Sequence, residues 1–555
     1  MENVNHYTVR NAFYDLLRAH GINTIFGNPG STEQTMLKNF PSDFQYVLSL
    51  QEASVVATAD GYAQATRKPA VVSLHTAAGT GNGMGNIMTA FLNKTPLVII
   101  AGQQTREMLI GDPFLTNRNS TIMPQPWIKW AYEPVRAVDV PAAVNRALAM
   151  AMMPPAGPVY LSVPWDDWNV ETTAPPLPRT ISTRIAPDPK LLQNFANRLG
   201  MAKRPVLILG SEVDRSLGWN AAVQLAELLQ SPVFQSPMSD RASFPERHRL
   251  FRGPLPGARG PLSEFLAPFD LVLVVGAEIF RYYPWVPGPI VPDGIDVLHI
   301  TNDPHDAASA LVGDSLLSDS KLALEALFKA LKGQEIKSTP GPELPSTHPE
   351  KTKSRQENGQ SNSGPITPAE AFEAIAEIRP SNAILLQESP SNGGDLMAAW
   401  PTETPESYMT FASGGLGWGA PASVGVAYAQ KQHGTGRPVI LVVGDGSIQY
   451  SIQSIYTAVQ HKLKLIYIVP QNFEYAVLKE FGVLEETPGV PGLDLHHLDA
   501  VAIAKAYGCR AVQVNDLEAI KAAFREALME DGPTLIQFQI DRTLRPLVAR
   551  HHGRA

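Results

Sequence analysis

The sequence predicts an α/β protein built from three doubly wound parallel-sheet domains. Short apolar runs alternate with segments of helical spacing in three stretches, residues 1–165, 190–332 and 365–545. This alternation is typical of parallel sheets that are covered by helices on both faces. Two connectors, residues 166–188 and 333–364, separate the stretches. The second is so rich in Pro and polar residues that we expect a flexible linker.

The apolar runs and helical spacings define the individual elements. In the first stretch, strands are expected at residues 23–27, 46–50, 70–74, 96–101 and 159–163, and helices at 8–20, 33–40, 53–67 and from Gly79 onward. In the second stretch, strands are expected at residues 206–209, 271–275 and 297–300. In the third, strands are expected at 383–387, 438–443 and 464–469 and helices at 370–378 and 415–428, with 501–507, 517–529 and 534–540 completing the domain.

Composition excludes several classes of protein. A net charge of −8 argues against a nucleic-acid or anionic-membrane partner. The single cysteine, Cys509, rules out an intrachain disulfide and indicates a reducing compartment, so we expect a cytoplasmic protein. No window approaches the roughly 20 apolar residues of a membrane span. Gly210 follows a strand without a G-x-G-x-x-G sequence, which favours a structural middle domain over a nucleotide site.

The residues Gly444-Asp445-Gly446-Ser447 follow one apolar run, and Asn472 follows the next. Parallel strands joined by a helix end at the same edge of a sheet, so Asp445 and Asn472 should lie together. A carboxylate and an amide oxygen suit Mg²⁺ or Ca²⁺, and the glycines let backbone N–H groups approach a phosphate. Gly-Asp-Gly alone is usually a simple turn, but together with Asn472 it indicates a metal–diphosphate site.

This pattern resembles the Gly-Asp-Gly…Asn motif of thiamin diphosphate enzymes. The family usually has Asn-Asn where this chain has Gln471-Asn472, so only the second position matches. The resemblance implies that thiamin diphosphate binds through Mg²⁺, with Ca²⁺ as an alternative, and that Asp445, Asn472 and the carbonyl of Glu474 bind the metal. It implies a cofactor-binding set made up of Glu52, Gly414, Leu416, Gly444, Asp445, Gly446, Ser447, Tyr450 and Asn472.

Glu52 stands just after an expected strand and ahead of the run Ala57-Thr-Ala-Asp-Gly-Tyr-Ala63. An acidic residue at a helix start is usually a dipole or capping partner. By the family resemblance, Glu52 instead hydrogen-bonds the aminopyrimidine ring and promotes the imino form that removes the thiazolium proton. A carboxyl group shielded from water serves this purpose because its proton affinity rises.

Two further runs, Phe26-Gly-Asn-Pro-Gly-Ser31 and Val71-Val-Ser-Leu-His75, are similar to one branch of the family, benzoylformate decarboxylase. In that branch the serine binds the substrate carboxylate and the histidine transfers protons. Ser31 could otherwise be a plain helix cap, and His75 a structural residue at a strand end. Ser31 follows one Gly-rich turn and His75 precedes another, and both turns lie on the sheet edge expected for Glu52. We therefore assign Ser31, His75 and Glu52 to catalysis.

The run Phe411-Ala-Ser-Gly-Gly-Leu-Gly-Trp418 resembles the family segment beneath the cofactor. By that match the Gly414 carbonyl meets the exocyclic amine, and Leu416 holds the cofactor bent; a Gly-rich helix start is the structural alternative. The match fails at one place. Family members carry a histidine in a Phe-Arg-Tyr-His run, and this chain has Tyr283 there. A phenol titrates near 10 and imidazole near 6.5, so Tyr283 is a poorer proton relay.

The substrate pocket is expected to be apolar, which suits an aromatic or other apolar 2-oxo acid. Ordinary core packing is the alternative role for these side chains. The paired histidines of pyruvate decarboxylases are absent from residues 112–120. Their absence argues against a pyruvate decarboxylase. The expected pocket residues are Phe114, Leu115, Tyr283, Phe411, Leu478 and Phe481.

The resemblance implies a lyase that decarboxylates a benzoylformate-like 2-oxo acid to an aldehyde through a thiamin enamine. Tyr283 leaves open a carboligase that forms acyloins, and a flavin in the middle domain would indicate an acetolactate synthase-like condensation. A non-catalytic regulator that binds the cofactor is a rival of another class. In the family the two cofactor-binding domains come from different subunits, so we expect a homodimer at minimum and a homotetramer as the full assembly.

Overall fold

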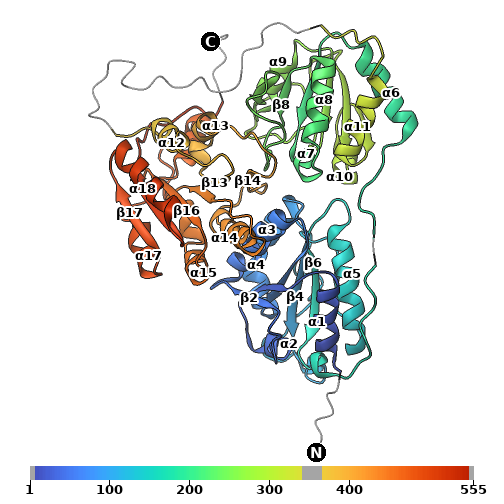
Figure 1. Ribbon diagram of the computed structural model, residues 1–555, viewed down its shortest axis with the longest axis vertical. Helices are drawn as coiled ribbons and strands as arrows, with labels where there is room; N and C mark the ends of the chain where they lie inside the picture. Colours follow the sequence, from blue (N-terminus) through green and yellow to red (C-terminus); the bar gives the residue numbers. More distant parts are fainter. Residues whose placement is uncertain (1–6, 180, 340–364, 549–555) are drawn as a thin grey trace, which may run out of the picture.

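The computed structural model describes residues 7–179, 181–339 and 365–548, and these residues form three sheets of six parallel strands (Figure 1). Each sheet belongs to one lobe of the molecule, from blue and teal through green to orange and red along the chain. This architecture confirms the expected α/β class of three parallel-sheet domains.

The N-terminal sheet has the strand order β2-β1-β3-β4-β6-β5. Its strands are β1 (Thr24–Gly27), β2 (Gln45–Leu48), β3 (Ala70–Leu74), β4 (Leu97–Gln103), β5 (Ala131–Tyr132) and β6 (Val159–Pro164). The helices are α1 (Val9–Ala19), α2 (Gln34–Leu37), α3 (Glu52–Thr66), α4 (Thr76–Leu92) and α5 (Val140–Met152), and a 3₁₀ turn, η1 (Ser31–Glu33), precedes α2.

Two expected helices of this domain differ from those observed. Helix α4 begins at Thr76 rather than at Gly79, because the Gly79 N–H already donates to the His75 carbonyl oxygen at 2.6 Å. The helix expected at residues 33–40 is reduced to η1 and α2. Helix α2 ends at Leu37 because Asn39 takes the left-handed backbone, with φ of 52°, just ahead of Pro41.

The middle sheet has the order β12-β11-β10-β7-β8-β9. Its strands are β7 (Pro205–Leu209), β8 (Val233–Gln235), β9 (Phe251–Pro254), β10 (Leu271–Val275), β11 (Asp296–Thr301) and β12 (Asp314–Leu317). The helices around it are α6 (Pro189–Met201), α7 (Ser211–Arg215), α8 (Trp219–Leu229), α9 (Arg259–Leu266), α10 (Pro304–Ser309) and α11 (Ser320–Leu331).

The C-terminal sheet has the order β14-β13-β15-β16-β18-β17. Its strands are β13 (Ile384–Glu388), β14 (Tyr408–Thr410), β15 (Val439–Val443), β16 (Leu465–Gln471), β17 (Arg510–Val514) and β18 (Thr534–Gln539). The helices include α12 (Pro368–Ala376), α13 (Gly393–Ala399), α14 (Gly419–Gln432), α15 (Ser454–Gln460), α16 (Ala476–Leu484), α17 (Ala500–Ala506) and α18 (Leu517–Met529).

One prediction for this domain was wrong. The helix expected at residues 415–428 starts only at Gly419, as α14. Residues 411–418 form a loop because Gly414 and Gly417 take positive φ values of 74° and 99°, which a helix does not accept. Gly414 and Leu416 therefore lie in this loop and not on a helix.

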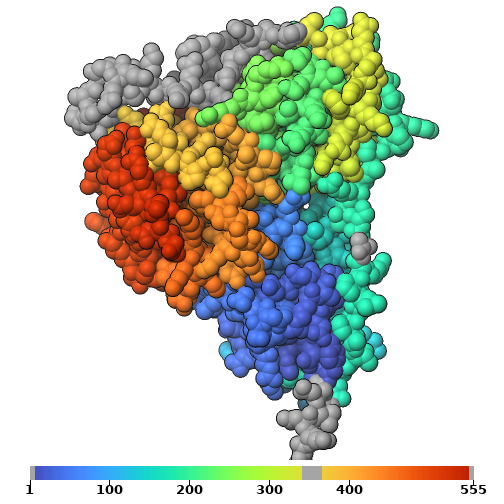
Figure 2. Space-filling view, in the orientation of Figure 1, coloured from blue at the N-terminus to red at the C-terminus, as the bar shows by residue number. Residues whose placement is uncertain are grey.

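The C-terminal sheet shares its two faces with the other two domains. On β15, Leu441 belongs to a core that also contains Val72 of the N-terminal sheet. The neighbouring Ile440 and Val442 face the opposite core, which contains Leu273 of the middle sheet. In Figure 2 the orange surface accordingly lies against both the blue and the green lobes. The three domains thus form one packed body.

Helices α3 and α14 run side by side at the junction of the N- and C-terminal domains (Figure 1). A Cβ on Gly61 would lie 2.0 Å from the Ala422 carbonyl oxygen, and one on Gly425 would lie 1.9 Å from the Thr58 carbonyl oxygen. Only glycine allows this backbone contact. We call this contact the α3–α14 seam.

Asp60 links the same two domains through hydrogen bonds. Its buried carboxylate accepts hydrogen bonds from the Trp418 indole at 2.7 Å and the Asn93 amide at 2.9 Å. Burial raises the pKa of Asp60, and these hydrogen bonds oppose the rise. A polar link therefore accompanies the apolar packing between the two domains.

Each connector begins with residues that still contact the domain before it. The first opens with a 3₁₀ turn, η4 (Asp167–Asn169), and Glu171 pairs with Thr8. At the start of the second, the Lys337 N–H donates to the Gly200 carbonyl oxygen of the middle domain. The flexible linker was expected at 333–364, and residues 340–364 of it lie outside the described residues. In the part of the chain that the structure describes, no helix is long and apolar enough to cross a membrane.

Candidate active site

The expected metal ligands follow two neighbouring strands of the C-terminal sheet. β15 and β16 pair in parallel, with Val442 opposite Ile468, so Asp445 and Asn472 emerge at the same sheet edge. The Phe473 backbone N–H donates to Asp445 Oδ2 at 2.7 Å and ties the two turns together. The predicted convergence of these turns is confirmed.

Asp445 is held as a buried acceptor. Its Oδ1 accepts the Gly446 backbone N–H at 3.0 Å. Burial raises the pKa of Asp445 to about 6, and hydrogen bonds from the N–H groups of Phe473 and Gly446 act to lower this pKa. A cation beside the carboxylate would favour its ionised form.

Asn472 and Glu474 share a tight turn. The Glu474 N–H donates to Asn472 Oδ1 at 3.2 Å, and Phe473 between them takes φ of 58°. The Glu474 carboxylate accepts a hydrogen bond from Lys479 at 2.6 Å and also contacts Arg542. Both cations contact Oε2, which leaves the buried Oε1 without a hydrogen-bond partner among the residues that the structure describes, so the backbone carbonyl that the resemblance implies is not the only free oxygen of Glu474.

These donors fit a hard divalent ion. Carboxylate, amide and backbone oxygens are the ligands that Mg²⁺ and Ca²⁺ prefer. Across residues 7–179, 181–339 and 365–548, no group of three His, Cys, Asp or Glu side chains could hold a metal. A divalent ion at this edge would therefore draw on Asn472 and a backbone carbonyl in addition to Asp445.

The turn after β15 offers backbone to a phosphate. Gly446 precedes a 3₁₀ turn, η6 (Ser447–Tyr450), in which Ser447 is buried and Tyr450 is exposed. The Gly444 N–H donates to the Glu388 carbonyl oxygen at 3.0 Å, which fixes the start of the turn on β13. N–H groups in such a turn form an anion-binding concavity.

Glu388, which the sequence reasoning missed, anchors the loop of residues 411–418. Its carboxylate, at the end of β13, accepts the Gly417 N–H at 2.8 Å and also the Gly419 N–H. Burial raises the pKa of Glu388 to about 7, and these backbone N–H groups oppose the rise. The loop carries exposed Gly414 and half-buried Leu416. The available sequence signal was an acidic residue at the end of an apolar run.

Glu52 lies in the first turn of α3 and is buried. Its two carboxylate oxygens accept amide hydrogens from Asn28 at 3.4 Å and Asn82 at 3.0 Å. Asn28 directly follows β1, and Asn82 lies in the second turn of α4, which follows β3. Glu52 is therefore an oriented, largely dehydrated carboxylate, as the proposed proton chemistry requires.

Ser31 and His75 gather at this same edge. They follow β1 and β3, which pair with Gly27 opposite Ser73. Gly79 lies between His75 and Glu52, since a Cβ there would lie 3.3 Å from Glu52 Cγ and 3.5 Å from His75 Cβ. Ser31 is exposed at the start of η1. The histidine ring also contacts Glu33, a second residue that the sequence reasoning missed.

Asn86 joins the start of α3 to the loop of the C-terminal domain. Its amide donates to the Ala53 carbonyl oxygen at 2.9 Å and to the Gly417 carbonyl oxygen at 3.4 Å. The hydrogen bonds of Glu52 with Asn28 and Asn82, and of Asp445 with Gly446 and Phe473, lie within their own domains. The candidate residues thus form two groups, one on each sheet edge.

The expected pocket residues are only partly brought together. Tyr283 packs on Phe481 with ring centroids 5.0 Å apart. Phe411 packs against the core shared by the N- and C-terminal domains, which supports its structural role. Phe114 is 88% exposed, Leu478 is also exposed, and Leu115 takes φ of 63°. In a single chain these last three therefore do not enclose a cavity.

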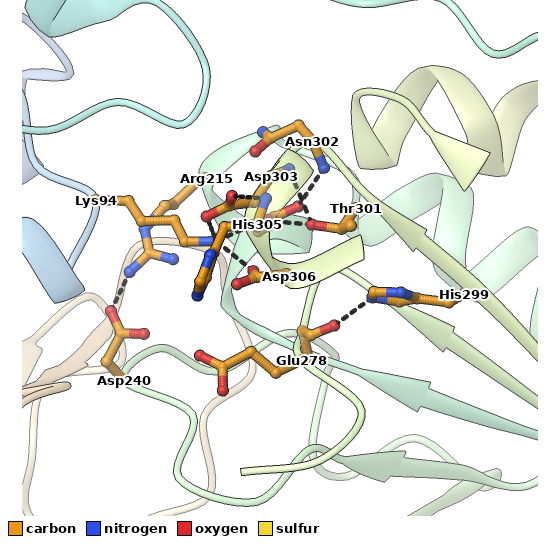
Figure 3. Close-up of polar contacts among 12 residues, drawn as sticks. Lys94, Arg215, Asp240, Glu278, His299, Thr301, Asn302, Asp303, His305 and Asp306 are labelled. Atoms are coloured by element: carbon orange, nitrogen blue, oxygen red, sulfur yellow. Dashed lines mark hydrogen bonds and ion pairs between the residues drawn. The ribbon is translucent and has the colours of Figure 1, made fainter. Parts of the chain in front are cut away.

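A lysine of another domain enters the crevice at the carboxyl edge of the middle sheet (Figure 3). Lys94 reaches in from the N-terminal domain and lies 3.0 Å from Glu212, 3.0 Å from Asp303 and 2.7 Å from Asp306. Burial disfavours its charge, but the three carboxylates outweigh that effect and raise the pKa of Lys94. A crevice lined by carboxylates and occupied by a lysine is poorly suited to an anionic nucleotide.

Family models match three parts of the chain. The N-terminal TPP binding domain of thiamine pyrophosphate enzymes matches residues 7–117, the central domain matches 192–327, and the C-terminal TPP binding domain matches 392–538.

Individual proteins are similar along nearly the whole chain. The benzoylformate decarboxylase of Pseudomonas aeruginosa is 41% identical over 536 residues, covering 96% of this chain and 98% of that protein. The structure of benzoylformate decarboxylase from Polynucleobacter necessarius matches with a TM-score of 0.92 and 47% identity, covering 97% and 100%. A thiamine diphosphate-dependent 4-hydroxybenzoylformate decarboxylase from Rhodococcus jostii RHA1 matches with a TM-score of 0.90 and 38% identity, covering 97% and 100%.

Proposed function

The chain belongs to the thiamine pyrophosphate enzyme family, and from this premise we propose that it decarboxylates an aromatic 2-oxo acid of the benzoylformate type. The reaction is non-oxidative and yields CO₂ and an aldehyde. The gathering of Glu52, His75 and Ser31 at one sheet edge carries this proposal. The benzoylformate and 4-hydroxybenzoylformate decarboxylases that match the whole chain support the substrate class.

The C-terminal edge provides the diphosphate and metal site of this proposal. Bound thiamin diphosphate supplies the sink for the electrons released when the carboxylate leaves as CO₂. Asp445, Asn472 and the Glu474 carbonyl would hold Mg²⁺, for which Ca²⁺ can substitute. The residues that would line the diphosphate and the bend of the cofactor are Gly444, Gly446, Ser447, Tyr450, Gly414 and Leu416.

The N-terminal edge provides the proton chemistry. Glu52, oriented by Asn28 and Asn82, would hold a proton at the ring nitrogen of the aminopyrimidine. Ser31 Oγ would bind the substrate carboxylate, and His75 would exchange a proton with the reacting atoms. A positioned general acid or base of this kind contributes roughly 100- to 10,000-fold to a rate.

A second copy of the chain would complete the site. Ile110 and Phe114 are 97% and 88% exposed on one segment of the N-terminal domain, and such exposed apolar side chains suit burial against another copy. We therefore propose a homodimer at minimum and a homotetramer as the full assembly. Cys509 is buried and unpaired, and a cytoplasmic location is part of the same proposal.

The deciding experiment measures CO₂ and aldehyde from benzoylformate and a panel of aromatic and aliphatic 2-oxo acids, with and without thiamin diphosphate and Mg²⁺. We expect turnover of the aromatic acids that depends on both additions. Absence of CO₂ release from every acid in the presence of both would refute the function and leave the non-catalytic regulator.

The alternatives on the same cofactor are less well supported. A flavin-bearing, acetolactate synthase-like enzyme would need a ligand in the middle domain, where Lys94 and three carboxylates form an ion-pair cluster in the crevice. A carboligase is motivated by Tyr283 alone, whereas the whole-chain relatives named above are decarboxylases. Acyloin as the main product in the screen would reverse this preference.

A further inference from the structure

We propose that Glu33 is a positioning residue that fixes the tautomer and the orientation of the His75 ring. The inference rests on the proposed catalytic role of His75. Glu33 was not expected as a site residue from the sequence, and its contacts identify it.

The Glu33 carboxylate is saturated by three donors. It is 3% exposed. Oε2 accepts the Gly30 backbone N–H at 2.9 Å and lies 3.0 Å from His75 Nδ1, while Oε1 accepts the Thr32 hydroxyl at 2.6 Å. A buried carboxylate that faces an imidazole at this distance forms a charge-assisted hydrogen bond.

These contacts determine which ring nitrogen of His75 carries hydrogen. An ionised carboxylate only accepts, so Nδ1 must donate. Thr32 Oγ1, 3.2 Å from Nδ1, has given its own hydrogen to Glu33 and can only accept as well. The Nδ1 side of the ring is thus fully engaged, and Nε2 is left to exchange a proton with a bound substrate.

Two glycines make room for this arrangement. A Cβ on Gly30 would lie 2.1 Å from His75 Nδ1, and a Cβ on Gly102 of β4 would lie 2.1 Å from Glu33 Oε1. Any side chain at either position would push the carboxylate and the ring apart. The backbone is therefore built closely around the Glu33–His75 pair.

The other titratable groups around the pair are Tyr46, Tyr160 and Glu52. Burial raises the pKa of Tyr46, and it raises that of Tyr160 to about 12, so both phenols are neutral at physiological pH. Glu52 approaches from beyond Gly79 and is bound to Asn28 and Asn82. The charge in direct contact with the imidazole is that of Glu33.

A purely structural role would be the capping of η1 through the Gly30 N–H. A glutamine at position 33 can still accept that hydrogen and the Nδ1 hydrogen, but it carries no charge. Glu370 makes the equivalent capping bond to the Thr367 N–H at 3.0 Å in the C-terminal domain, so Glu370→Gln is a matched control.

The first test is a double-mutant cycle on benzoylformate with the holoenzyme. Glu33→Gln should lower kcat about 10- to 100-fold with little change in KM, and Glu370→Gln should leave both unchanged. In a His75→Ala background, Glu33→Gln should cost nothing further, because it acts through the ring. Additive losses, or a His75→Ala variant as active as the unchanged enzyme, would overturn the proposal.

The second test does not depend on turnover. Modification of His75 by diethyl pyrocarbonate at one fixed pH, followed by peptide mass spectrometry, reports how readily the ring reacts. We expect faster modification in Glu33→Gln than in the unchanged and Glu370→Gln proteins, because the charge-assisted hydrogen bond to Nδ1 is weakened. Equal rates would refute the inference even if decarboxylation is confirmed, and a faster rate would support it even if no substrate is found.

Discussion

The backbone N–H of Gly417 donates a 2.8 Å hydrogen bond to the buried carboxylate of Glu388. The second oxygen of Glu388 takes the Gly419 N–H at the start of α14. One side chain at the end of β13 therefore holds both ends of the backbone turn beside Leu416. This relationship gives the first of five predictions.

Glu388→Gln should loosen the loop of residues 411–418. The glutamine NH₂ would face a backbone N–H, so one buried donor loses its acceptor at a cost of about 1–3 kcal/mol. We expect a lower urea midpoint and weaker binding of thiamin diphosphate in a fluorescence titration. The surface variant Glu377→Gln, which removes an exposed ion pair with Lys521, should change neither. Unaltered cofactor affinity in Glu388→Gln would contradict the anchoring role.

Glu246→Gln should change how stability depends on pH. Burial raises the pKa of Glu246 to about 8, and the hydrogen bond from the Thr402 N–H opposes this rise. The unfolded chain loses this proton near pH 4.5 and the folded chain near pH 8, so this group destabilises the fold progressively as pH rises between them. We compare the denaturation midpoints of the variant and the unchanged protein at about pH 5 and about pH 9. The difference should be larger at the higher pH, where the variant should be the more stable protein. Parallel pH dependences would show that Glu246 is not the cause.

Lys94→Met should destabilise the junction of the N-terminal and middle domains. The substitution leaves Glu212, Asp303 and Asp306 without their shared cation, and breaking a buried ion pair from one side costs about 3–5 kcal/mol. Chemical denaturation should show this loss, whereas Met at the exposed Lys464 should show none. A variant as stable as the unchanged protein would mean that water or Arg215 replaces the lysine.

Metal removal should abolish turnover reversibly. Chelation followed by gel filtration should give an inactive protein that Mg²⁺ or Ca²⁺ restores, because oxygen donors bind both ions. Asp445→Asn should need more than about 100-fold higher metal concentration for half-maximal activity, since second-shell changes alone cost 10- to 100-fold. Full activity of the chelated enzyme would remove the metal from the mechanism.

Tyr283→His should change the product ratio. A phenol is a poor proton relay at neutral pH, and Tyr283 lies against Phe481 beside the expected pocket. Restoring an imidazole should raise the ratio of aldehyde to acyloin by about tenfold or more, measured by chromatography with an excess of acceptor aldehyde. Tyr283→Phe is the matched control and should not raise the ratio. An unchanged ratio in the histidine variant would place position 283 outside the proton path.

Most interior strands of the three sheets could be predicted from the sequence, and most edge strands could not. Strands β3 and β10 have the predicted bounds, because a strand buried on both faces is a continuous apolar run. The missed strands are the three-residue interior strand β8 and the edge strands β5, β9, β12, β14 and β17, whereas the edge strand β2 was predicted. Edge strands are short and partly solvated, so their sequences lack such a run.

The site shows a similar division. Asp445 and Asn472 could be placed together because each follows a recognisable strand, and parallel strand ends coincide. Glu33 and Glu388 act on His75 and Gly417, which are distant in sequence, so local pattern carries no sign of either contact. Residues 415–418 were mistaken for helix because small residues are frequent in helices and loops alike, and composition does not reveal a positive φ.

The α3–α14 seam has a consequence for recombination between related genes. Gly61 and Gly425 meet backbone to backbone although one belongs to the N-terminal and the other to the C-terminal domain. A chimaera with its crossover between these domains would take the two helices from different parents and would misalign both halves at once. An exchange confined to the middle domain, between the two connectors, would keep both helices of the seam from the same parent.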